Sequence, residues 1–192
     1  MATLNEHVSI RGMGAYLPPK IVTNKEIEAL LDTTDEWIRT RSGIEQRHIA
    51  EKEDSTSGIG LIAAERALAD AGFEAKDMDM LFVATISPDH EMPGTACFLQ
   101  DKLGLSGIPA IDVRQQCSGF IFALSQARQY LATGAARRIL VVASEIHSKC
   151  LNGTPRGRDV TVLLGDGAAA VVLTNEATGG LAKGKDVRIG CQ

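Results

Sequence analysis

A cysteine stands where the pattern of the chain changes from strand to helix. The segment "IPAIDV" has the length and apolar content of a short buried strand, and the residues after Cys117 follow a helical spacing. The first N–H groups of a helix have no partner within the helix, and their partial positive charge stabilises an anion. This position favours the thiolate of Cys117 and therefore predicts a nucleophilic cysteine.

The alternative interpretation of Cys117 is a buried structural cysteine, because most free cysteines in folded proteins are buried. Ser118 and Gly119 favour a nucleophile, since both are small and leave room for a substrate carbonyl. The backbone N–H of Cys117 is also placed to face a developing oxyanion. The other three cysteines are interpreted as structural, the first because it lies on the apolar face of its helix: Cys97, Cys150 and Cys191.

Two further patterns in the sequence do not indicate a catalytic or phosphate-binding site. No spacing ties a histidine to Cys117, so we expect none of the four to be catalytic: His7, His48, His90 and His147. The stretch "GDGAAAVVL" lacks both the G-x-G-x-x-G spacing and the Lys-Ser/Thr of a phosphate-binding loop. We interpret Gly165-Asp166-Gly167 as a tight turn between two strands.

Alternating strand and helix patterns predict the scaffold that positions Cys117. Residues 79–87 and 137–145 are nearly continuous apolar runs, typical of strands covered on both faces. Residues 55–72 predict a longer helix, in which Ile59, Ile62, Ala63 and Ala67 share one face. The pattern as a whole indicates an α/β domain with a central sheet between helical layers, and the tail 179–192 resembles the start of a further strand.

The composition indicates a globular protein. The chain has 192 residues, of which 44% are hydrophobic and 23% charged, and this length allows one large domain. The net charge of -4 gives no general attraction to nucleic acid or to an anionic membrane. The sequence shows no signal peptide and no apolar run near the roughly 20 residues of a membrane span. Four separated cysteines without a C-x-x-C pair favour the reducing cytoplasm, with no metal site.

Five motifs, in register, carry a family resemblance. They are "GMGAYLPPKIVTN", "LLDTTDEWIRTRSGIEQRHIA", "DMDMLFVATISPDHEMPGTAC", "DVRQQCSGFIFAL" and "GDGAAAVVL". Together they resemble β-ketoacyl-acyl carrier protein synthase III, the thiolase-superfamily condensing enzyme that starts fatty acid biosynthesis, along essentially the entire chain. The resemblance implies a thiolase-like α-β-α layered fold with a mixed central sheet. Residues 1–192 would form the first of two similar halves, and the C-terminal half is absent from this chain.

The resemblance also implies roles for individual residues. Cys117 matches the nucleophile that takes an acyl group from acyl-CoA. Trp37 and Arg41 match the tryptophan and arginine that bind CoA, and Arg156 in "TPRGRD" matches a second such arginine. Met92 matches a residue that reaches across a dimer interface to close the partner's acyl pocket. By residue type alone, a core residue is the commoner interpretation of Trp37, and surface charges are the commoner interpretation of Arg41 and Arg156. For Met92, a simple loop methionine is an equal alternative.

The sequence lacks the residues expected to catalyse the second step of the reaction, the condensation. In the family, a histidine and an asparagine of the second half assist the decarboxylation of malonyl-acyl carrier protein, and no "HQAN"-like segment occurs here. We expect a homodimer without a permanently bound cofactor, whose C-terminal half completes a decarboxylative Claisen condensation with malonyl-acyl carrier protein. The alternatives are a related acyltransferase with another acceptor and a non-catalytic assembly half. Without its second half, the chain is expected to leave a sheet face uncovered.

Overall fold

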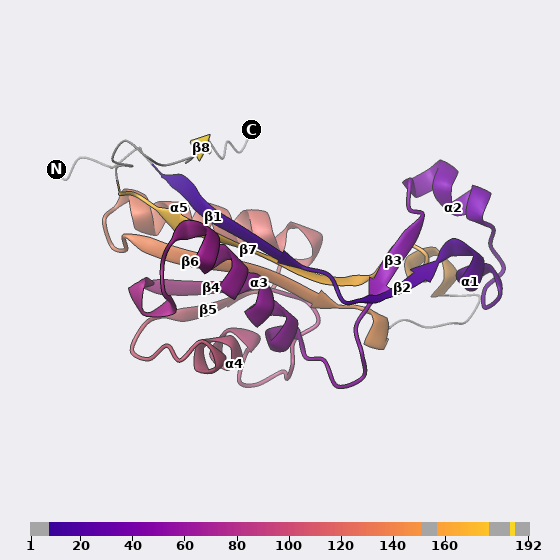
Figure 1. Cartoon of the computed structure of the whole chain (residues 1–192), viewed down its shortest axis with the longest axis horizontal. Helices are drawn as coiled ribbons and strands as arrows, with labels where there is room; N and C mark the ends of the chain where they lie inside the picture. Colours follow the sequence, from indigo (N-terminus) through magenta and orange to yellow (C-terminus); the bar gives the residue numbers. More distant parts are fainter. Residues whose placement is uncertain (1–7, 151–156, 177–184, 187–192) are drawn as a thin grey trace.

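A six-stranded sheet forms the centre of the computed structural model, which describes residues 8–150, 157–176 and 185–186. The strand order is β5-β4-β6-β7-β1-β8. Helices α3 (Thr56–Ala71) and α4 (Thr95–Lys102) cover one face, and α5 (Gly119–Ala132) covers the other (Figure 1). The strands are β1 (Ser9–Tyr16), β4 (Met80–Ala84), β5 (Ala110–Val113), β6 (Arg138–Ile146), β7 (Asp166–Thr174) and β8 (Lys185–Asp186).

The sheet is mixed, as the sequence predicts. β4 pairs in parallel with β5 and β6, whereas β7 pairs antiparallel with β6 and β1. The strands β1, β4, β5 and β6 therefore run in one direction, and their carboxyl ends meet at one edge of the sheet, where β7 begins. In open α/β sheets this is the edge at which ligands bind.

Alternate side chains of the central strands belong to two separate hydrophobic cores, one on each face of the sheet. In β4, Leu81 and Val83 pack with α3 and α4, whereas Phe82 and Ala84 pack with α5. This alternation follows from the period of two in a strand and explains why residues 79–87 are apolar on both faces. The predicted face of α3 is confirmed for Ile59, Ala63 and Ala67, which are buried, whereas Ile62 is only half-buried.

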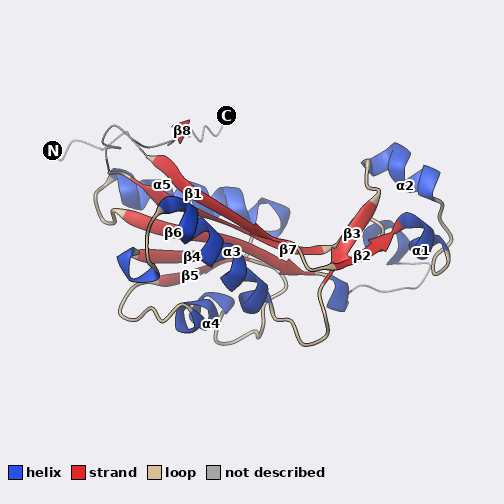
Figure 2. Ribbon diagram, viewed as in Figure 1, coloured by secondary structure: helices blue, strands red, loops and turns tan. Residues whose placement is uncertain are grey.

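A smaller unit extends from the same edge of the sheet (Figures 1 and 2). It contains the antiparallel pair β2 (Lys20–Thr23) and β3 (Gln46–Ile49), with α1 (Asn24–Glu28) and α2 (Asp35–Ser42) between them. Its core is made of Ile27, Leu31, Ile38 and Val162. Val162 follows α6 (Arg158–Thr161), so the segment before β7 belongs to this unit.

A buried arginine ties the smaller unit together. Arg47 on β3 donates to the side-chain oxygen of Asn24 and to the carbonyl of Val162, over 2.9 and 3.0 Å. Burial lowers the pKa of Arg47, because the charged guanidinium is removed from water. These bonds connect residues that are far apart in the sequence and fix α6 against β3.

Two predictions about the segment before β7 are wrong. The apolar segment 159–164, expected as the strand before the turn, begins within α6 and forms no strand. Gly165-Asp166-Gly167 is not a turn between two strands, because β7 begins at Asp166. Asp166 is 5% exposed, and its carboxylate accepts hydrogen bonds from the N–H groups of Ala50 and Ser148. Contacts with distant segments therefore fix this stretch, and they override its strand-like pattern.

Two further predictions are corrected. Cys97 is exposed, because α4 turns Thr95, Ala96 and Leu99 inward instead; Cys150 is exposed as well. The sheet face expected to be uncovered carries α5, on which Ile121 and Phe122 are 52% and 50% exposed. Other exposed apolar side chains, among them Met13 and Leu17, lie outside this helix. His7, Arg156 and Cys191 lie outside the described residues. Among the described residues, no helix combines the length and the hydropathy needed to cross a bilayer.

Candidate active site

Cys117 lies in a single 3-10 turn, Gln116–Ser118, between β5 and α5. The turn is closed by Ser118, whose N–H and hydroxyl both donate to the carbonyl of Gln115, over 3.1 and 3.0 Å. The side chain of Cys117 is exposed, which contradicts the interpretation as a buried structural cysteine. The strand-to-helix junction read from the sequence is confirmed, and it presents the thiol at the edge where the parallel strands end.

The residue before the cysteine has an unusual backbone conformation. Gln116 has a φ of 39°, and it is the one non-glycine residue with a positive φ in the described part of the chain. A side chain with a Cβ is strained there, at a typical cost of about 1–3 kcal/mol. Such strain persists only where the surrounding structure imposes it, and it is concentrated at functional sites.

We expect Gln116→Gly to leave the free energy of unfolding unchanged or slightly raised, because glycine adopts positive φ without strain. Gln116→Val should lower it by about 1–3 kcal/mol, since a β-branched side chain tolerates this conformation least. Urea denaturation measures both. The matched control is Gln115, whose φ of -137° is negative: Gln115→Val should cost less than Gln116→Val. Equal effects of valine at the two positions would contradict the assignment of strain to Gln116.

Asp112 of β5 anchors the helix that follows the Met92 loop. Its carboxylate accepts a hydrogen bond from the N–H of Ala96, over 3.1 Å, at the start of α4. A Cβ at Gly94 would lie 2.0 Å from the carboxylate oxygen, so a larger residue there would displace the side chain of Asp112. Burial raises the pKa of Asp112, although the backbone N–H groups of Ala96 and Thr95 act in the opposite direction.

Met92 lies in the loop 85–94, between β4 and α4, with 88% of its surface exposed. The preceding residue, Glu91, forms an ion pair with Arg114, whose guanidinium lies 2.9 Å from the carboxylate. Arg114 stands three positions before Cys117. The structure therefore brings the Met92 loop beside the segment that leads to the thiol.

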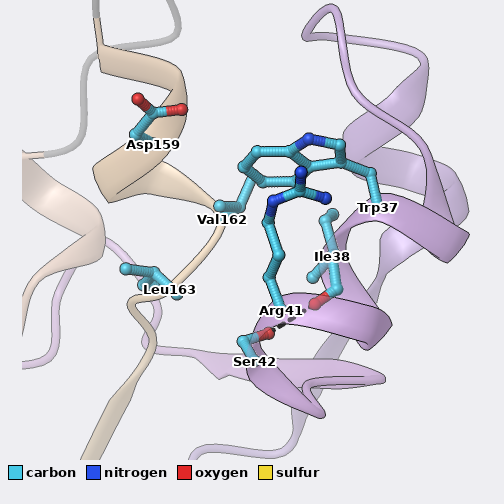
Figure 3. A pocket seen from close by; sticks show the side chains of 7 residues that line it. All are labelled: Trp37, Ile38, Arg41, Ser42, Asp159, Val162 and Leu163. Atoms are coloured by element: carbon cyan, nitrogen blue, oxygen red, sulfur yellow. Dashed lines mark hydrogen bonds between the residues drawn. The ribbon is translucent and has the colours of Figure 1, made fainter.

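Trp37 forms a second site, on α2. The guanidinium carbon of Arg41 lies 4.4 Å from the centre of the indole, and that of Arg158 lies at the same distance. A cavity of about 270 Å³ opens here, and Figure 3 shows the guanidinium of Arg41 against the indole. It is lined by Trp37, Ile38, Arg41, Ser42, Asp159, Val162 and Leu163. An aromatic face beside two fixed positive charges suits a ligand that is both aromatic and anionic.

Arg158 is the residue that sequence reasoning missed. The stretch "TPRGRD" contains two arginines, and the prediction names Arg156, which lies outside the described residues. Arg158 begins α6, donates to the carbonyl of Asp32 over 2.9 Å and stacks on Trp37. The only signal in the sequence was the presence of a second arginine two positions further on.

The two sites share one edge of the sheet and do not form a single cavity. Cys117 follows β5, the unit with Trp37 follows β1, and both strands end at this edge. The residues that line the Trp37 cavity come from α2 and from residues 159–163. A ligand that reaches both sites must therefore be long, with an aromatic anionic end at Trp37 and a reactive end at the thiol.

Comparisons with known proteins agree on one family. A family profile described as 3-oxoacyl-[acyl-carrier-protein (ACP)] synthase III matches residues 111–186. The β-ketoacyl-[acyl-carrier-protein] synthase III of Geobacillus kaustophilus is 48% identical over 164 residues, 85% of this chain and 52% of that protein. The chain spans about half the length of the curated relatives that it matches.

Solved structures give the same result. The 3-oxoacyl-[acyl-carrier-protein] synthase III of Aquifex aeolicus matches with a TM-score of 0.83 at 40% identity, covering 87% of this chain and 53% of that one. The priming β-ketosynthase of the R1128 polyketide biosynthetic pathway matches with a TM-score of 0.84 at 33% identity, covering 91% and 52%. These matches confirm the predicted thiolase-like layered fold.

Proposed function

Because the chain belongs, over the half of those proteins that it spans, to the β-ketoacyl-acyl carrier protein synthase III family, we propose that it is the acyl-accepting half of a condensing acyltransferase. Cys117 is the nucleophile, and acyl-CoA is the acyl donor. The observation that carries the proposal is the exposed thiol of Cys117 in a strained turn at the edge that also holds Trp37.

Acylation requires only a thiol exchange. The thiolate of Cys117 attacks the carbonyl carbon of the acyl-CoA thioester and forms a new C–S bond. The bond to the sulfur of CoA then breaks, and CoA leaves as a thiolate that takes up a proton. The reactant and the product of this step are both thioesters, so the exchange is nearly neutral in energy. A positioned thiolate is sufficient to make it fast.

Trp37, Arg41 and Arg158 suit the nucleotide end of CoA. Both guanidinium groups stack on the indole, so adenine would take the place of one of them on the ring, and their charges would pair with the phosphates of CoA. The pantetheine arm then spans from this unit to Cys117, which explains why the two sites lie apart on one edge. Met92, on its exposed loop, is the proposed contact for the acyl chain, contributed across the interface of a homodimer.

The condensation itself is assigned to a second, similar half that follows this one. There the acyl group leaves Cys117 for the carbon of malonyl-acyl carrier protein that loses CO₂, and a β-ketoacyl product remains on the carrier. The histidine and asparagine that the family uses for decarboxylation would come from that half. The chain therefore acts with acyl carrier protein and acyl-CoA as its substrates, without a bound cofactor.

The test is to mix the full-length protein with acetyl-CoA, and with several longer acyl-CoAs, and to measure the mass of the intact protein. We expect one added acyl group per chain, and digestion should locate it on the peptide that contains Cys117. Variants of the two other exposed cysteines, Cys97→Ala and Cys150→Ala, should keep the adduct. Absence of an adduct with every donor favours a non-catalytic assembly half. An adduct without condensation onto malonyl-acyl carrier protein favours an acyltransferase with another acceptor.

Replacement of the indole should weaken the binding of CoA without affecting the thiol. Stacking of a base on an aromatic side chain is worth about 1–3 kcal/mol, so we expect Trp37→Ala to raise the KM for acyl-CoA roughly tenfold. The same variant should use acyl-pantetheine, which lacks the nucleotide, as well as the unaltered protein does. An equal loss with both donors would contradict the assignment. In the same assay, Arg158→Ala and Arg156→Ala decide which of the two arginines binds CoA, and we expect the larger effect at Arg158.

A further inference from the structure

Arg114 joins the end of β5 to the loop that carries Met92. It follows the last residue of β5 and precedes Cys117 by three positions, whereas Glu91 directly precedes Met92. Nη1 of Arg114 donates to Oε2 of Glu91 over 2.9 Å, and Nη2 donates to Oε1 over 3.3 Å. Two parallel bonds fix the orientation of the two groups as well as their separation.

The rest of this loop is held by other elements. At its start, Ser87 donates through its N–H to Glu145 of β6, over 3.1 Å. In its middle, Asp89 accepts from the N–H of Ser57 on α3, also over 3.1 Å. For residues 91–93, the bonds between Glu91 and Arg114 are the only hydrogen bonds to another element within the described part of the chain. The position of Met92 therefore depends on this ion pair.

The ion pair lies beside a cavity of about 370 Å³ at the carboxyl ends of the parallel strands. The cavity is lined by residues from the loops after β4, β5 and β6, among them Ile86, Glu91, Arg114, Lys149 and Cys150. The hydrogen bond from Arg114 lowers the pKa of Glu91, so both groups carry their charges at neutral pH. The ion pair thus ties the tip of the Met92 loop to the end of β5.

The solvent exposure of the ion pair limits its contribution to the stability of the domain. The side chains of Arg114 and Glu91 are 51% and 80% exposed, and exposed ion pairs add little to global stability. Such a pair can still decide where the loop tip lies, because no other hydrogen bond or ion pair among the described residues ties residues 91–93 to another element. Its effect is therefore expected in the loop and in what the loop contacts, and not in the unfolding of the domain.

We propose that Arg114 is a positioning residue, which fixes the place of Met92 on its loop and thereby determines which acyl chains fit the pocket that Met92 would close across the dimer interface. The proposal rests on the function proposed above, since it assumes that Cys117 takes an acyl group. It adds a specificity role for a side chain that contacts neither the thiol nor the nucleotide site.

The first measurement follows hydrogen exchange of the backbone amides of residues 90–94 in the full-length protein. We expect Arg114→Gln and Glu91→Gln each to raise the exchange rate about threefold, the size of effect that an exposed ion pair gives. The charge-reversed double variant, Arg114→Glu with Glu91→Arg, should restore the slow exchange. Lys76→Gln is the matched control, because Lys76 forms an equally exposed ion pair with Glu74 on the surface turn Ala75–Asp77. This control should leave residues 90–94 unchanged.

The second measurement is the ratio of the Cys117 acylation rates with a short and a long acyl-CoA. We expect the single variants of Arg114 and Glu91 to change this ratio about threefold, the double variant to restore it and Lys76→Gln to leave it unaltered. Unchanged exchange in the single variants would overturn the proposal. So would faster exchange with an unchanged ratio, because Arg114 would then be a structural contact only. If no acyl-CoA acylates Cys117, the proposed function is wrong. This failure can be distinguished from failure of the Arg114 proposal, because hydrogen exchange still reports whether the ion pair holds the loop.

Discussion

Replacing Cys117 by alanine is expected to abolish acylation and to lower the rate of acyl transfer on the order of 10³-fold or more. The reason is chemical: the proposed reaction passes through a covalent thioester, and no other side chain in the turn Gln116–Ser118 can form one. The exposed position of the thiol predicts that the substitution leaves the fold intact, since no packing is lost. The loss should appear in kcat and in the mass of the acylated protein, with an unchanged midpoint of urea denaturation.

Cys97→Ala and Cys150→Ala are the matched controls, because both cysteines are also exposed and belong to the described part of the chain. They should retain full activity. Cys117→Ser provides a second comparison, since a hydroxyl is a much weaker nucleophile than a thiolate and should recover little of the rate. Activity that persists in Cys117→Ala would contradict the proposed chemistry, whatever the effect of the other variants.

The second large effect concerns the packing of α3 on β1. A Cβ placed on Gly14 would lie 2.3 Å from the carbonyl oxygen of Ala63 and 2.4 Å from the backbone nitrogen of Ala67. At Gly12 the corresponding Cβ would lie 2.4 Å from the backbone nitrogen of Ala71. These are backbone atoms of the helix, so they can move only if the whole helix moves away from the strand. The small residues on both elements allow this approach, and the close contact buries the apolar face of α3.

We therefore expect Gly14→Ala to lower the free energy of unfolding by about 3 kcal/mol, at the upper end of the usual cost of overpacking. That is a large share of the about 5–15 kcal/mol that stabilises a typical domain. Urea denaturation measures the change as a lower midpoint with an unchanged slope. Gly12→Ala should behave in the same way.

Gly60→Ala is the control for this experiment, because Gly60 lies within α3 itself. A Cβ there would lie 3.4 Å from the Cβ of Ser144, which is an ordinary contact. Alanine also favours a helix over glycine by about 1 kcal/mol, so this substitution should be neutral or stabilising. If Gly14→Ala and Gly60→Ala had equal effects, the close approach of β1 and α3 would not be what stabilises this layer.

Much of the scaffold could be predicted because the signals are local. Thr23 and Thr34 cap α1 and α2, Gly43 ends α2 with a φ of 74°, and Ser55 caps α3, all residue types that favour these positions. The spacing of apolar residues predicted the central strands, because their burial on both faces leaves a continuous apolar run. The exposed position of Cys117 follows from the same kind of local signal, because the spacing of apolar residues changes there from that of a strand to that of a helix.

The errors lie where distant segments compete with a local pattern. Residues 159–164 look like a strand, but Arg158 stacks on Trp37 and Val162 packs against Ile38, so the segment begins within a helix of the smaller unit. Cys97 has an apolar neighbourhood in the sequence, but the contact of α4 with the sheet turns Leu99 inward and leaves the cysteine exposed. Neither outcome can be read from a window of neighbouring residues.

The sequence by itself determined the kind of chemistry: a cysteine at a strand-to-helix junction, in an α/β scaffold, with a tryptophan and arginines in recognisable motifs. Only the tertiary structure decided which groups meet. It placed Arg158 on Trp37 and paired Arg114 with Glu91. The physical reason is that periodicity and capping act over a few residues, whereas these contacts depend on loops that β-strand pairing gathers at one edge of the sheet.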